Sequence, residues 1–596
     1  MAPIRLPGSP APGSPLLADV PRPRRRVLRS LVLLLALAAI ALVFASHSKI
    51  PASLEPLKER IVYFRQDDAS LQLSEAVAAQ QEPEPVAEEQ FEEEEVKPKH
   101  WSEEDQQLRK YRFKTPEVHE SLERRLQELS PEQRLVREWL RRTRSFNTGG
   151  TGVGLDASDP PRPIRPAPRA DRRKGEGPGE LSGGSQTKFA DLEAEWKTGR
   201  PADVCGPGAW QDEYAALHAD MLSGKREPHL LEFTCRDGDY CGGIADRLLG
   251  MVTTFLYSLL TNRAFCMTWE QPAPLDMLFD SPFIDWSRPF SNSSSTPVPL
   301  PYSDPALVEQ RRSINAHNWE EPAIDEFFPR FVEDFGEGKA TPWLQLDFNR
   351  GVVIRSFSYP SIRPHLDRLG LKLDIVYSCL INYLLRPKAA VLDFIAQYSS
   401  LFALPEFFVV GIQVRTGDQS MWATRKDTVN TVSHHSQYFR CAAQVAATYA
   451  HPSQKVLYYL ATDSRVLEED ALKRFPDQVV VTGLKPAHVE IKTDKSDGLK
   501  AMKRAADGFM RTVAENWIFA ATDFQILTYR SGFGKLPTWL RGRPNTTVQL
   551  LNPHMDPVYT RMVKKKNKGK LPPVVDCTKP EALKSFSDMA QDWSLG

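Results

Sequence analysis

The chain has 596 residues, and its 76 lysines and arginines balance its 76 aspartates and glutamates. This length exceeds one ordinary core and indicates several segments, and the balanced charge gives no polyelectrolyte character that would favour nucleic acid as a partner. The 48 prolines indicate that part of the chain lies outside folded core, and the seven cysteines include no CxxC pair of the kind that zinc sites use.

The N-terminal residues have the order expected of a membrane anchor, with a basic tail at 1–29 and an apolar segment at 30–46. The run LVLLLALAAIALVFAS is slightly short of the ~20 residues of a typical span, but it suits the thinner bilayer of the early secretory pathway. Because the arginines precede it, the positive-inside rule predicts a cytoplasmic N-terminus and a lumenal remainder, a type II arrangement. A cleaved signal peptide is the alternative, since Ala45 and Ser46 are small residues that suit cleavage.

Residues 47–186 are expected to form a partly disordered stem. They contain the acidic run EPEPVAEEQFEEEEV and, from about Ser102 to Arg144, a charged stretch with helical periodicity. Leu122, Leu126 and Leu129 fall on one face of this stretch, which predicts an amphipathic, solvated helix. Blocks of like charge repel each other and stay extended, so the stem is interpreted as a spacer without chemistry.

Globular character begins at about residue 187, and residues 187–404 are expected to form the N-terminal, acceptor-side half. The segment CRDGDYCGGIADRLLG places Gly242 and Gly243 before an apolar helix, which would expose backbone amides and a helix N-terminus to a ligand. Gly242, Gly243 and Arg247 are therefore candidate loop contacts, although glycines in this position often serve only a tight turn. Cys235 and Cys241 are close enough for a local disulfide, with two buried thiols as the alternative.

Residues 405–596 are expected to form the C-terminal half, which begins with the apolar run FFVVGIQV, ending at Val414. Such a run is typical of a buried parallel strand. Arg415 follows where the strand meets its loop, and ligands of open α/β sheets gather at such strand ends. Its guanidinium offers a permanently charged planar fork for a diphosphate. The alternative is a structural ion pair with Asp418.

Two further strand ends follow in the same half. The segment KVLYYLATDSRVLEEDALKRFPDQVVV predicts a strand, a helix and a strand, which is a βαβ unit of a parallel sheet, with Asp463 at the first strand end. The segment FQILTYRSGFG predicts another strand, at 524–528, and then a turn that contains Ser531 and opens toward a helix. Carboxyl ends of parallel strands meet at one edge, so Arg415, Asp463 and Ser531 should converge there. Asp463 as a helix N-cap is the alternative.

Taken in order, the segments VGIQVRTGD, YLATDSRVLEEDALKRFP and AENWIFAATDFQILTYRSGFG resemble the three signature blocks of the GT-B α1,2/α1,6/O-fucosyltransferase superfamily. The segment GGIADRLLGMVTTFLYSLLTNRAF is similar to the N-terminal glycine block of the plant xyloglucan type. The likeness covers about Thr234 to Leu540. It implies an α/β fold of the GT-B kind, with two Rossmann-like halves facing a cleft, and it covers none of the membrane-anchored stem expected before them.

The resemblance also implies roles for single residues in binding the donor. Arg415 would hold the β-phosphate of GDP-fucose, and Glu515 would contact the guanosine. Ser531, followed by Gly532, would lie beside the diphosphate. GDP-fucose is a substrate in this interpretation, and no cofactor is expected.

The resemblance also covers two further positions, without assigning either a contact with a particular part of the donor. Asp463 matches an aspartate of the second block, and Gln413 stands where the α1,6 and bacterial nodulation enzymes have histidine and where the plant type has glutamine. Both are candidate donor-binding residues. For the catalytic base, Asp418 and Asp427 are the nearest carboxylates, and a base must lie within hydrogen-bond reach of the acceptor hydroxyl.

The expected reaction is an inverting transfer of fucose to a glycan hydroxyl at the Golgi membrane, with inversion taken from the resemblance. It is expected to be metal-independent, because Asp237 and Asp239 form the nearest DxD-like pair and have no supporting apolar strand. Two alternatives stay open: a non-catalytic lumenal glycan-binding protein that keeps the fold, and a GT-B transferase with another nucleotide-sugar donor. The sequons at Asn292 and Asn545 agree with a lumenal location.

Overall fold

The structure is a computed structural model that describes most of residues 116–146, 210–286, 343–417, 430–485, 498–552 and 574–591, with a few shorter pieces. The predicted tail at 1–29 and anchor at 30–46 lie outside the described residues, as does most of the predicted stem. Asp237, Asp239 and the sequon at Asn292 also lie outside them. The expectation that no apolar strand supports Asp237 and Asp239 is wrong, because the buried strand Leu230–Cys235 ends two residues before Asp237.

The C-terminal half contains a five-stranded parallel sheet of order β11-β10-β7-β8-β9. Its strands are β7 (Phe407–Val414), β8 (Lys455–Thr462), β9 (Val479–Val480), β10 (Phe524–Thr528) and β11 (Thr547–Leu550). The chain runs outward from β7 to β9, then returns to the other side of β7 to form β10 and β11. This is the strand order of a Rossmann sheet. The order in which strands are added to the sheet reverses between β7 and β10, while all the strands stay parallel.

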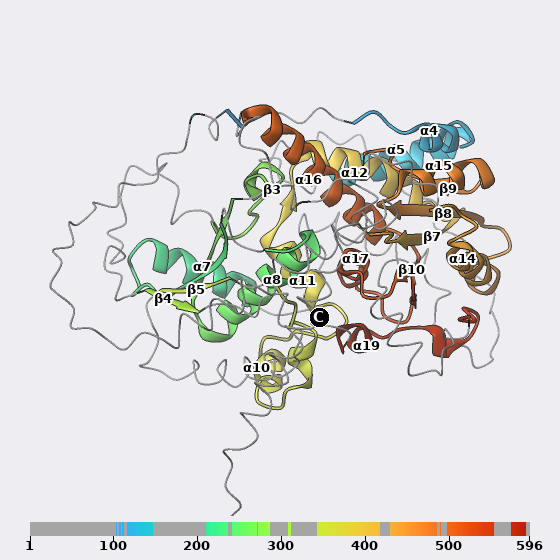
Figure 1. Ribbon diagram of the computed structural model, residues 1–596. Helices are drawn as coiled ribbons and strands as arrows, with labels where there is room; N and C mark the ends of the chain where they lie inside the picture. Colours follow the sequence, from blue (N-terminus) through green and yellow to red (C-terminus); the bar gives the residue numbers. More distant parts are fainter. Residues whose placement is uncertain are drawn as a thin grey trace, which may run out of the picture. The chain divides into compact units, whose positions relative to one another are not determined.

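Helices cover both faces of this sheet (Figure 1). The even-numbered side chains of β7 pack in one apolar cluster with α14 (Ser436–Tyr449) and α15 (Arg465–Arg474). Phe407 and Val409, which point the other way, pack in a second cluster with α12 (Ala389–Phe402) and α16 (Gly498–Ala520). Because both faces are covered, every position of β7 is buried, which explains its continuous apolar sequence.

The N-terminal half contains a four-stranded parallel sheet of order β2-β1-β5-β4. Its strands are β1 (Leu230–Cys235), β2 (Ala264–Trp269), β4 (Val308–Arg311) and β5 (Trp343–Leu346). The structure therefore confirms an α/β protein with parallel sheets, as the sequence indicated.

The helix predicted after Gly242 and Gly243 is α8 (Ile244–Thr261), and it ends at Asn262 in the left-handed conformation, with φ of 53°. Within the part of the chain that is described, α8 has the length and apolarity of a membrane span, but 89% of this window is buried inside the protein. Its side chains contribute to the same cluster as β1 and β2. In this fold α8 is therefore a core helix.

The remaining elements are helices, 3₁₀ turns and short strands. They are α7 (Trp210–Leu222), η3 (Leu275–Met277), β3 (Phe279–Asp280), η7 (Arg355–Ser358), α10 (Arg363–Arg368), α11 (Val376–Leu384), β6 (Arg386–Pro387), α17 (Gly532–Arg541), η9 (Pro580–Ala582) and α19 (Phe586–Gln591). The helical run before the β7 strand is interrupted at Pro387, because proline disfavours helical geometry in the residue before it.

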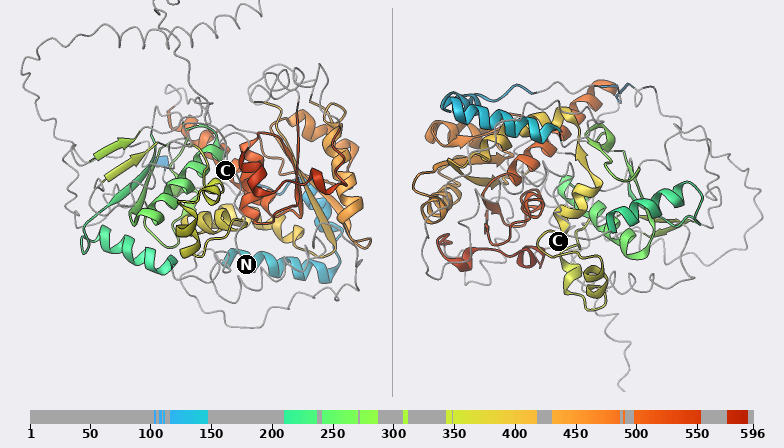
Figure 2. Two further views of the ribbon diagram at one scale, coloured as in Figure 1. Left: turned by 90° about the horizontal axis from the view of Figure 1, so that it is seen from below. Right: turned by 180° about the vertical axis from the view of Figure 1, so that it is seen from behind.

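The charged stretch expected in the stem forms α4 (Glu120–Gln127) and α5 (Pro131–Phe146), which pack on the C-terminal half. The expectation of a solvated helix is wrong here, because Leu122 is fully buried. Ser121 Oγ accepts a hydrogen bond of 3.2 Å from the amide of Val481, beside the edge strand β9. Figure 2 shows α5 alongside α12. The unpaired backbone of an edge strand needs cover, and α4 supplies part of it.

Disulfides connect loops in both halves. Cys235 and Cys241 are bonded, which confirms the predicted local pair, and Cys441 of α14 is bonded to Cys577. Cys379 is disulfide-bonded as well. Among the described cysteines Cys266 is a free, buried thiol.

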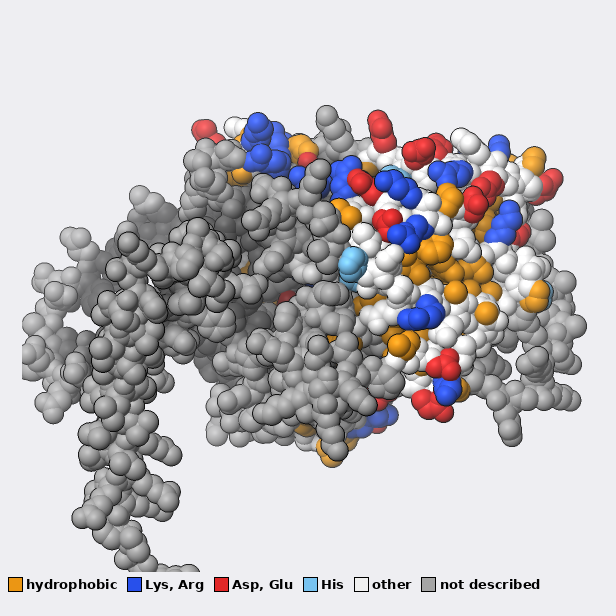
Figure 3. Space-filling view, turned by 45° about the vertical axis from the view of Figure 1, so that its right-hand side comes forward, with side chains coloured by type: hydrophobic (Ala, Val, Ile, Leu, Met, Phe, Trp, Pro, Cys, Tyr) orange, Lys and Arg blue, Asp and Glu red, His pale blue; other side chains and the backbone are white. Residues whose placement is uncertain are grey.

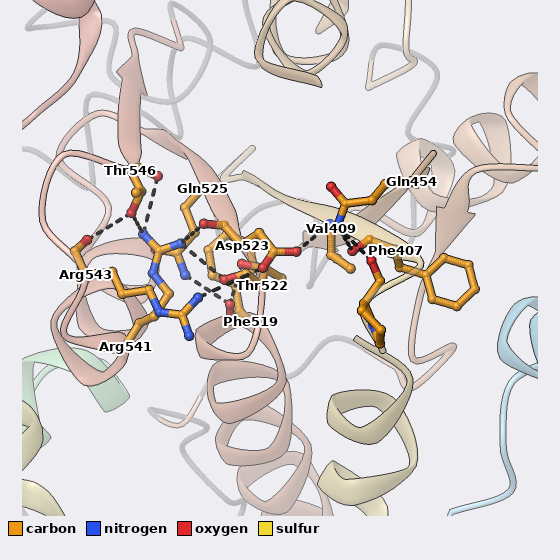
Figure 4. Close-up of polar contacts among 11 residues, drawn as sticks. Phe407, Val409, Gln454, Phe519, Thr522, Asp523, Gln525, Arg541, Arg543 and Thr546 are labelled. Atoms are coloured by element: carbon orange, nitrogen blue, oxygen red, sulfur yellow. Dashed lines mark hydrogen bonds and ion pairs between the residues drawn. The ribbon is translucent and has the colours of Figure 1, made fainter. Parts of the chain in front are cut away.

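Buried polar contacts, shown in Figure 4, hold the amino-terminal edge of the five-stranded sheet. Asp523 Oδ2 accepts a hydrogen bond of 2.8 Å from the amide of Val409, and Arg541 Nη1 donates to the carbonyl of Asp523 at 3.0 Å. Gln454 Nε2 donates to the carbonyl of Phe407 at 3.1 Å. These contacts fix the strand starts, at the edge opposite the predicted ligand site.

Candidate nucleotide-binding site

The candidate site lies where β7 and β10 end, at the point where the strand order of the five-stranded sheet reverses. In open α/β sheets this is the place where ligands bind. Gln413 is near the end of β7, Arg415 follows β7, Asp463 follows β8 and Ser531 follows β10. Hydrogen bonds connect Gln413 with Ser531 and Arg415 with Asp463, so the strand ends that carry Arg415, Asp463 and Ser531 share one edge as the sequence indicated.

Asp463 organises the loop after β7. One oxygen accepts hydrogen bonds from the amide and hydroxyl of Thr416, at 2.7 and 2.8 Å, and the other accepts from the amide of Gly417 at 3.0 Å. The second oxygen also forms an ion pair with Arg415 Nη1. Gly417 has φ of 111°, a region that favours glycine, and this turn is part of the loop that encloses the carboxylate. The N-cap alternative is wrong for Asp463, because Ser464 caps α15.

Arg415 is fixed at both its backbone and its side chain. Its amide donates to Thr528 Oγ1 at 2.9 Å, and its carbonyl accepts from Asn552 Nδ2 at 2.7 Å. The guanidinium pairs with Asp463, while 23% of the side chain remains exposed. A guanidinium presents five donors, so an ion pair with one carboxylate orients the fork without preventing a phosphate contact. Asp418, the partner that the alternative invoked, lies outside the described residues.

Gln413 and Ser531 form a buried pair between the two strand ends. Gln413 Nε2 donates to Ser531 Oγ at 3.1 Å, and Gln413 Oε1 accepts from the amide of Thr528 at 3.1 Å. Ser531 is the N-cap of α17, but its side chain makes no capping hydrogen bond. Gly532 and Phe533 contribute the first amides of α17. No preceding helical turn supplies carbonyl acceptors for the first amides of a helix. The N-terminus of α17 is therefore suited to an anion.

Glu515 lies elsewhere on the same sheet edge. It is in α16 and accepts a hydrogen bond of 2.5 Å from Thr482 Oγ1, just beyond β9, which is two strands from β7. Arg511 Nη2 is 2.9 Å from the Glu515 carboxylate. Burial, together with nearby Glu515, raises the pKa of Glu468 to about 7, although Arg511 acts against this shift. The predicted guanosine contact of Glu515 stays a prediction.

The candidate loop contacts of the N-terminal half are engaged within their own turn. The amide of Gly243 donates to Asp246 Oδ2 at 3.0 Å, and Arg247 Nε donates to the carbonyl of Gly242 at 2.8 Å. Gly242 has φ of 73°, which explains the need for glycine. The Arg247 guanidinium also lies 5.6 Å from the ring centroid of Trp269. This arrangement favours the tight-turn alternative.

Sequence reasoning did not identify the residues that brace the site. Thr528 Oγ1 accepts from the Arg415 amide, donates to the Gln413 carbonyl at 3.1 Å and lies 2.9 Å from the hydroxyl of Tyr438. A usable signal was present, because Thr528 is the last residue of a strand that leads directly into the Ser531 turn. Asn552 gave no comparable signal, since its contact depends on the path of the chain after β11.

The predicted catalytic bases, Asp418 and Asp427, lie outside the described residues. In the ranges that the structure does describe, no group of three or more histidine, cysteine, aspartate or glutamate side chains is arranged to hold a metal ion. Acidic and basic side chains are interspersed on the described part of the face shown in Figure 3.

Comparison with protein families finds no family model that matches the chain. A curated relative, the galactoside 2-alpha-L-fucosyltransferase of Arabidopsis thaliana, is 23% identical over 238 residues. This chain is similar to that fucosyltransferase over part of its length. The match covers 36% of this chain and 40% of the relative, so the chain spans less than half the length of the curated relative that it matches.

Two solved structures are also similar to this chain. A mutant of Arabidopsis thaliana FUT1 in complex with GDP is 15% identical and has a TM-score of 0.39, with 69% of this chain and 87% of that chain covered. NodZ alpha-1,6-fucosyltransferase, co-crystallised with GDP, is 14% identical and has a TM-score of 0.33, with 52% of this chain and 92% of that chain covered.

Proposed function

We propose that this chain is a fucosyltransferase that moves fucose from GDP-fucose to a glycan hydroxyl, with inversion and without a metal ion. In this proposal the two parallel sheets are the centres of the two halves of a GT-B fold, and the half with the five-stranded sheet binds the donor. The observation that carries the proposal is the fixed guanidinium of Arg415 at the switch point of a Rossmann-order sheet, where the neighbouring strand β10 leads into the N-terminus of α17.

The chemistry asks mainly for stabilisation of a diphosphate leaving group. Negative charge grows on the phosphate oxygens as the bond to the sugar breaks, and preorganised donors in a partly buried site stabilise that charge. Arg415 supplies a fixed positive charge, held by Asp463, and α17 supplies backbone amides and the positive end of its dipole. These groups can do the work that a divalent cation does in other transferases, which supports a metal-independent reaction.

The acceptor hydroxyl must lose a proton during the transfer. We propose that Asp418 or Asp427 accepts it, since these are the first two carboxylates that follow Arg415 in the sequence. Asp463 is a poor candidate because both of its oxygens already accept hydrogen bonds from the loop after β7. Its role in this proposal is to hold Arg415.

We propose a Golgi membrane location, with a single type II span at 30–46 and a lumenal catalytic region. The two bonded pairs, Cys235 with Cys241 and Cys441 with Cys577, support an oxidising compartment. Asn545 of the sequon Asn-Thr-Thr is exposed and supports access for glycosylation.

A donor panel tests this function. The lumenal segment, expressed from residue 47 onward, is incubated with GDP-fucose, GDP-mannose and UDP-galactose, each with a glycan array and with or without EDTA. We expect transfer from GDP-fucose alone, unchanged by EDTA, with release of GDP. Transfer from another donor would replace the donor assignment. Glycan binding without turnover of any donor would establish the non-catalytic alternative.

A further inference from the structure

We propose that Gln413 is a positioning residue, which turns the Ser531 hydroxyl into a hydrogen-bond donor to the diphosphate. The inference deepens the proposed function and rests on it, because it concerns how the same site holds the donor substrate. It reassigns Gln413, whose side chain is 2% exposed, from a ligand contact to a buried support of one.

The orientation of the Gln413 amide follows from its neighbours. The amide of Thr528 is a backbone donor, and it lies 3.1 Å from Gln413 Oε1. A backbone N–H can only donate, so the group that faces Thr528 must be the carbonyl oxygen of the glutamine. The NH₂ group of Gln413 therefore faces Ser531 Oγ, at 3.1 Å.

This orientation decides what the Ser531 hydroxyl can do. A hydroxyl has one proton to donate, and because Ser531 Oγ accepts from Gln413 its proton points to another acceptor. The Ser531 side chain does not cap α17, although the residue occupies the N-cap position. A phosphate at the N-terminus of α17 would receive this hydroxyl together with the amides of Gly532 and Phe533, and hydrogen bonds to charged acceptors are the stronger ones.

Gly534, in the first turn of α17, leaves room for the contact between Gln413 and Ser531. A Cβ atom on Gly534 would lie 2.7 Å from Gln413 Oε1 and 3.2 Å from a methyl carbon of Leu527. Glycine at this position allows the first turn of α17 to approach the β7 strand closely enough for Ser531 to reach Gln413. Gly534 is in regular helical geometry, so alanine there has no backbone penalty, and its effect would come from the contact with Gln413.

A double-mutant cycle in the lumenal chain tests the inference. The variants are Gln413→Met, Ser531→Ala and the two combined, and the measurements are the Kd of GDP by calorimetry and the KM and kcat with GDP-fucose. Gly534→Ala, alone and with Ser531→Ala, provides an independent route if Gln413→Met does not fold. Gln454→Met is the matched control, because Gln454 supports the opposite end of β7 by donating to the carbonyls of Pro405 and Phe407.

We expect Ser531→Ala to raise the Kd of GDP roughly tenfold, as loss of a hydrogen bond to a charged group implies. Gln413→Met and Gly534→Ala should each raise the Kd about three- to tenfold in the natural background and cause little further rise in the Ser531→Ala background. Gln454→Met should lower the Tm and leave the Kd of GDP within twofold.

The results separate this inference from the proposed function. Independent, multiplying effects of Gln413→Met and Ser531→Ala would overturn the positioning role, as would a Ser531→Ala variant with unchanged GDP affinity. If GDP does not bind the unmodified chain, the donor site itself is wrong and the inference falls with it. A Gln454→Met variant that weakens GDP as much as Gln413→Met would show that general loosening of β7 is the cause.

Discussion

Arg415 is the residue on which the proposed chemistry depends most. Lysine keeps the charge but cannot reproduce a planar fork that pairs with Asp463 and a phosphate together. We expect Arg415→Lys to lower kcat/KM for GDP-fucose roughly tenfold to a hundredfold, the effect of losing one or two charged hydrogen bonds. Initial rates of GDP release measure it.

Arg465→Lys is the matched control for that substitution. Arg465 begins α15 and forms an exposed ion pair of 3.0 Å with Glu469. Exposed pairs contribute little to stability, so this variant should have the natural kcat/KM. Near-normal turnover in Arg415→Lys would instead make the pair of Arg415 and Asp463 a structural contact without a role in the reaction.

Glu468 gives a pH dependence whose direction is fixed by its raised pKa. Burial raises the pKa in the folded protein to about 7 from an ordinary value of 4.5. The folded chain therefore binds this proton more tightly than the unfolded chain does. The stability that protonated Glu468 contributes is fully present below pH 4.5 and is lost as the pH rises toward 7.

Glu468→Gln removes this titration and keeps the side chain neutral. The Tm of the variant minus the Tm of the natural protein should therefore become more positive between pH 5 and pH 8, measured by thermal unfolding. The neighbouring Glu469→Gln is the control, since Glu469 is 55% exposed and its difference should stay flat. A flat difference for Glu468→Gln would refute the raised pKa.

At this scale the sequence predicted which side chains meet but not what each one does. Arg415, Asp463 and Ser531 could be placed together because strand ends of one parallel sheet share an edge. The saturation of Asp463 by the loop after β7 depends on contacts between residues about fifty positions apart. The burial of Gln413 depends on contacts between residues more than a hundred positions apart. Periodicity carries no information on such contacts.

Among the elements, α4 and α5 differ most from their expected setting. Their charged, prolonged sequence has the composition of a spacer, yet Leu122 is 0% exposed while Leu135 of the same segment is 61% exposed. Periodicity found the apolar face of this helix correctly. It could not show that the face has a partner, because the partners, β9 and α12, lie hundreds of residues later in the chain.

This pair of leucines gives a direct test of the packing. Leu122→Ala should destabilise the protein by about 2–5 kcal/mol, the usual cost of truncating a buried leucine. Leu135→Ala should change the stability by less than about 0.5 kcal/mol, as exposed substitutions do. Chemical denaturation measures both, and equal stabilities would mean that α4 is a detachable spacer.

The strands were the most predictable elements. The predicted strand at 524–528 coincides with β10, and the apolar run FFVVGIQV coincides with β7. Both strands are buried at every position because helices cover both faces of the sheet. β4 and β5 of the four-stranded sheet were not predicted, since four residues are too few for a periodic signal.

At the scale of the whole molecule, the disulfides should differ in their contribution to stability. Cys441 and Cys577 are 136 residues apart, whereas Cys235 and Cys241 are 6 apart. Loop-closure entropy predicts about 5 kcal/mol for the first and about 2 kcal/mol for the second. Replacing each pair by alanines and comparing unfolding free energies in non-reducing buffer tests this order, and a larger loss for the short loop would reverse it.

The C-terminal helix α19 has a consequence for how this protein is handled. Lys535, in the first turn of α17, donates to the carbonyl of Met589 at 2.8 Å, and Arg355 donates to the carbonyl of Ala590 at 2.6 Å. The last carbonyls of α19 thus receive two cations, as a helix C-terminus prefers. A chain shortened before residue 585 would remove an acceptor from a buried ammonium one turn from the proposed phosphate site. Affinity tags and fusion partners therefore belong at the N-terminal end of the expressed chain.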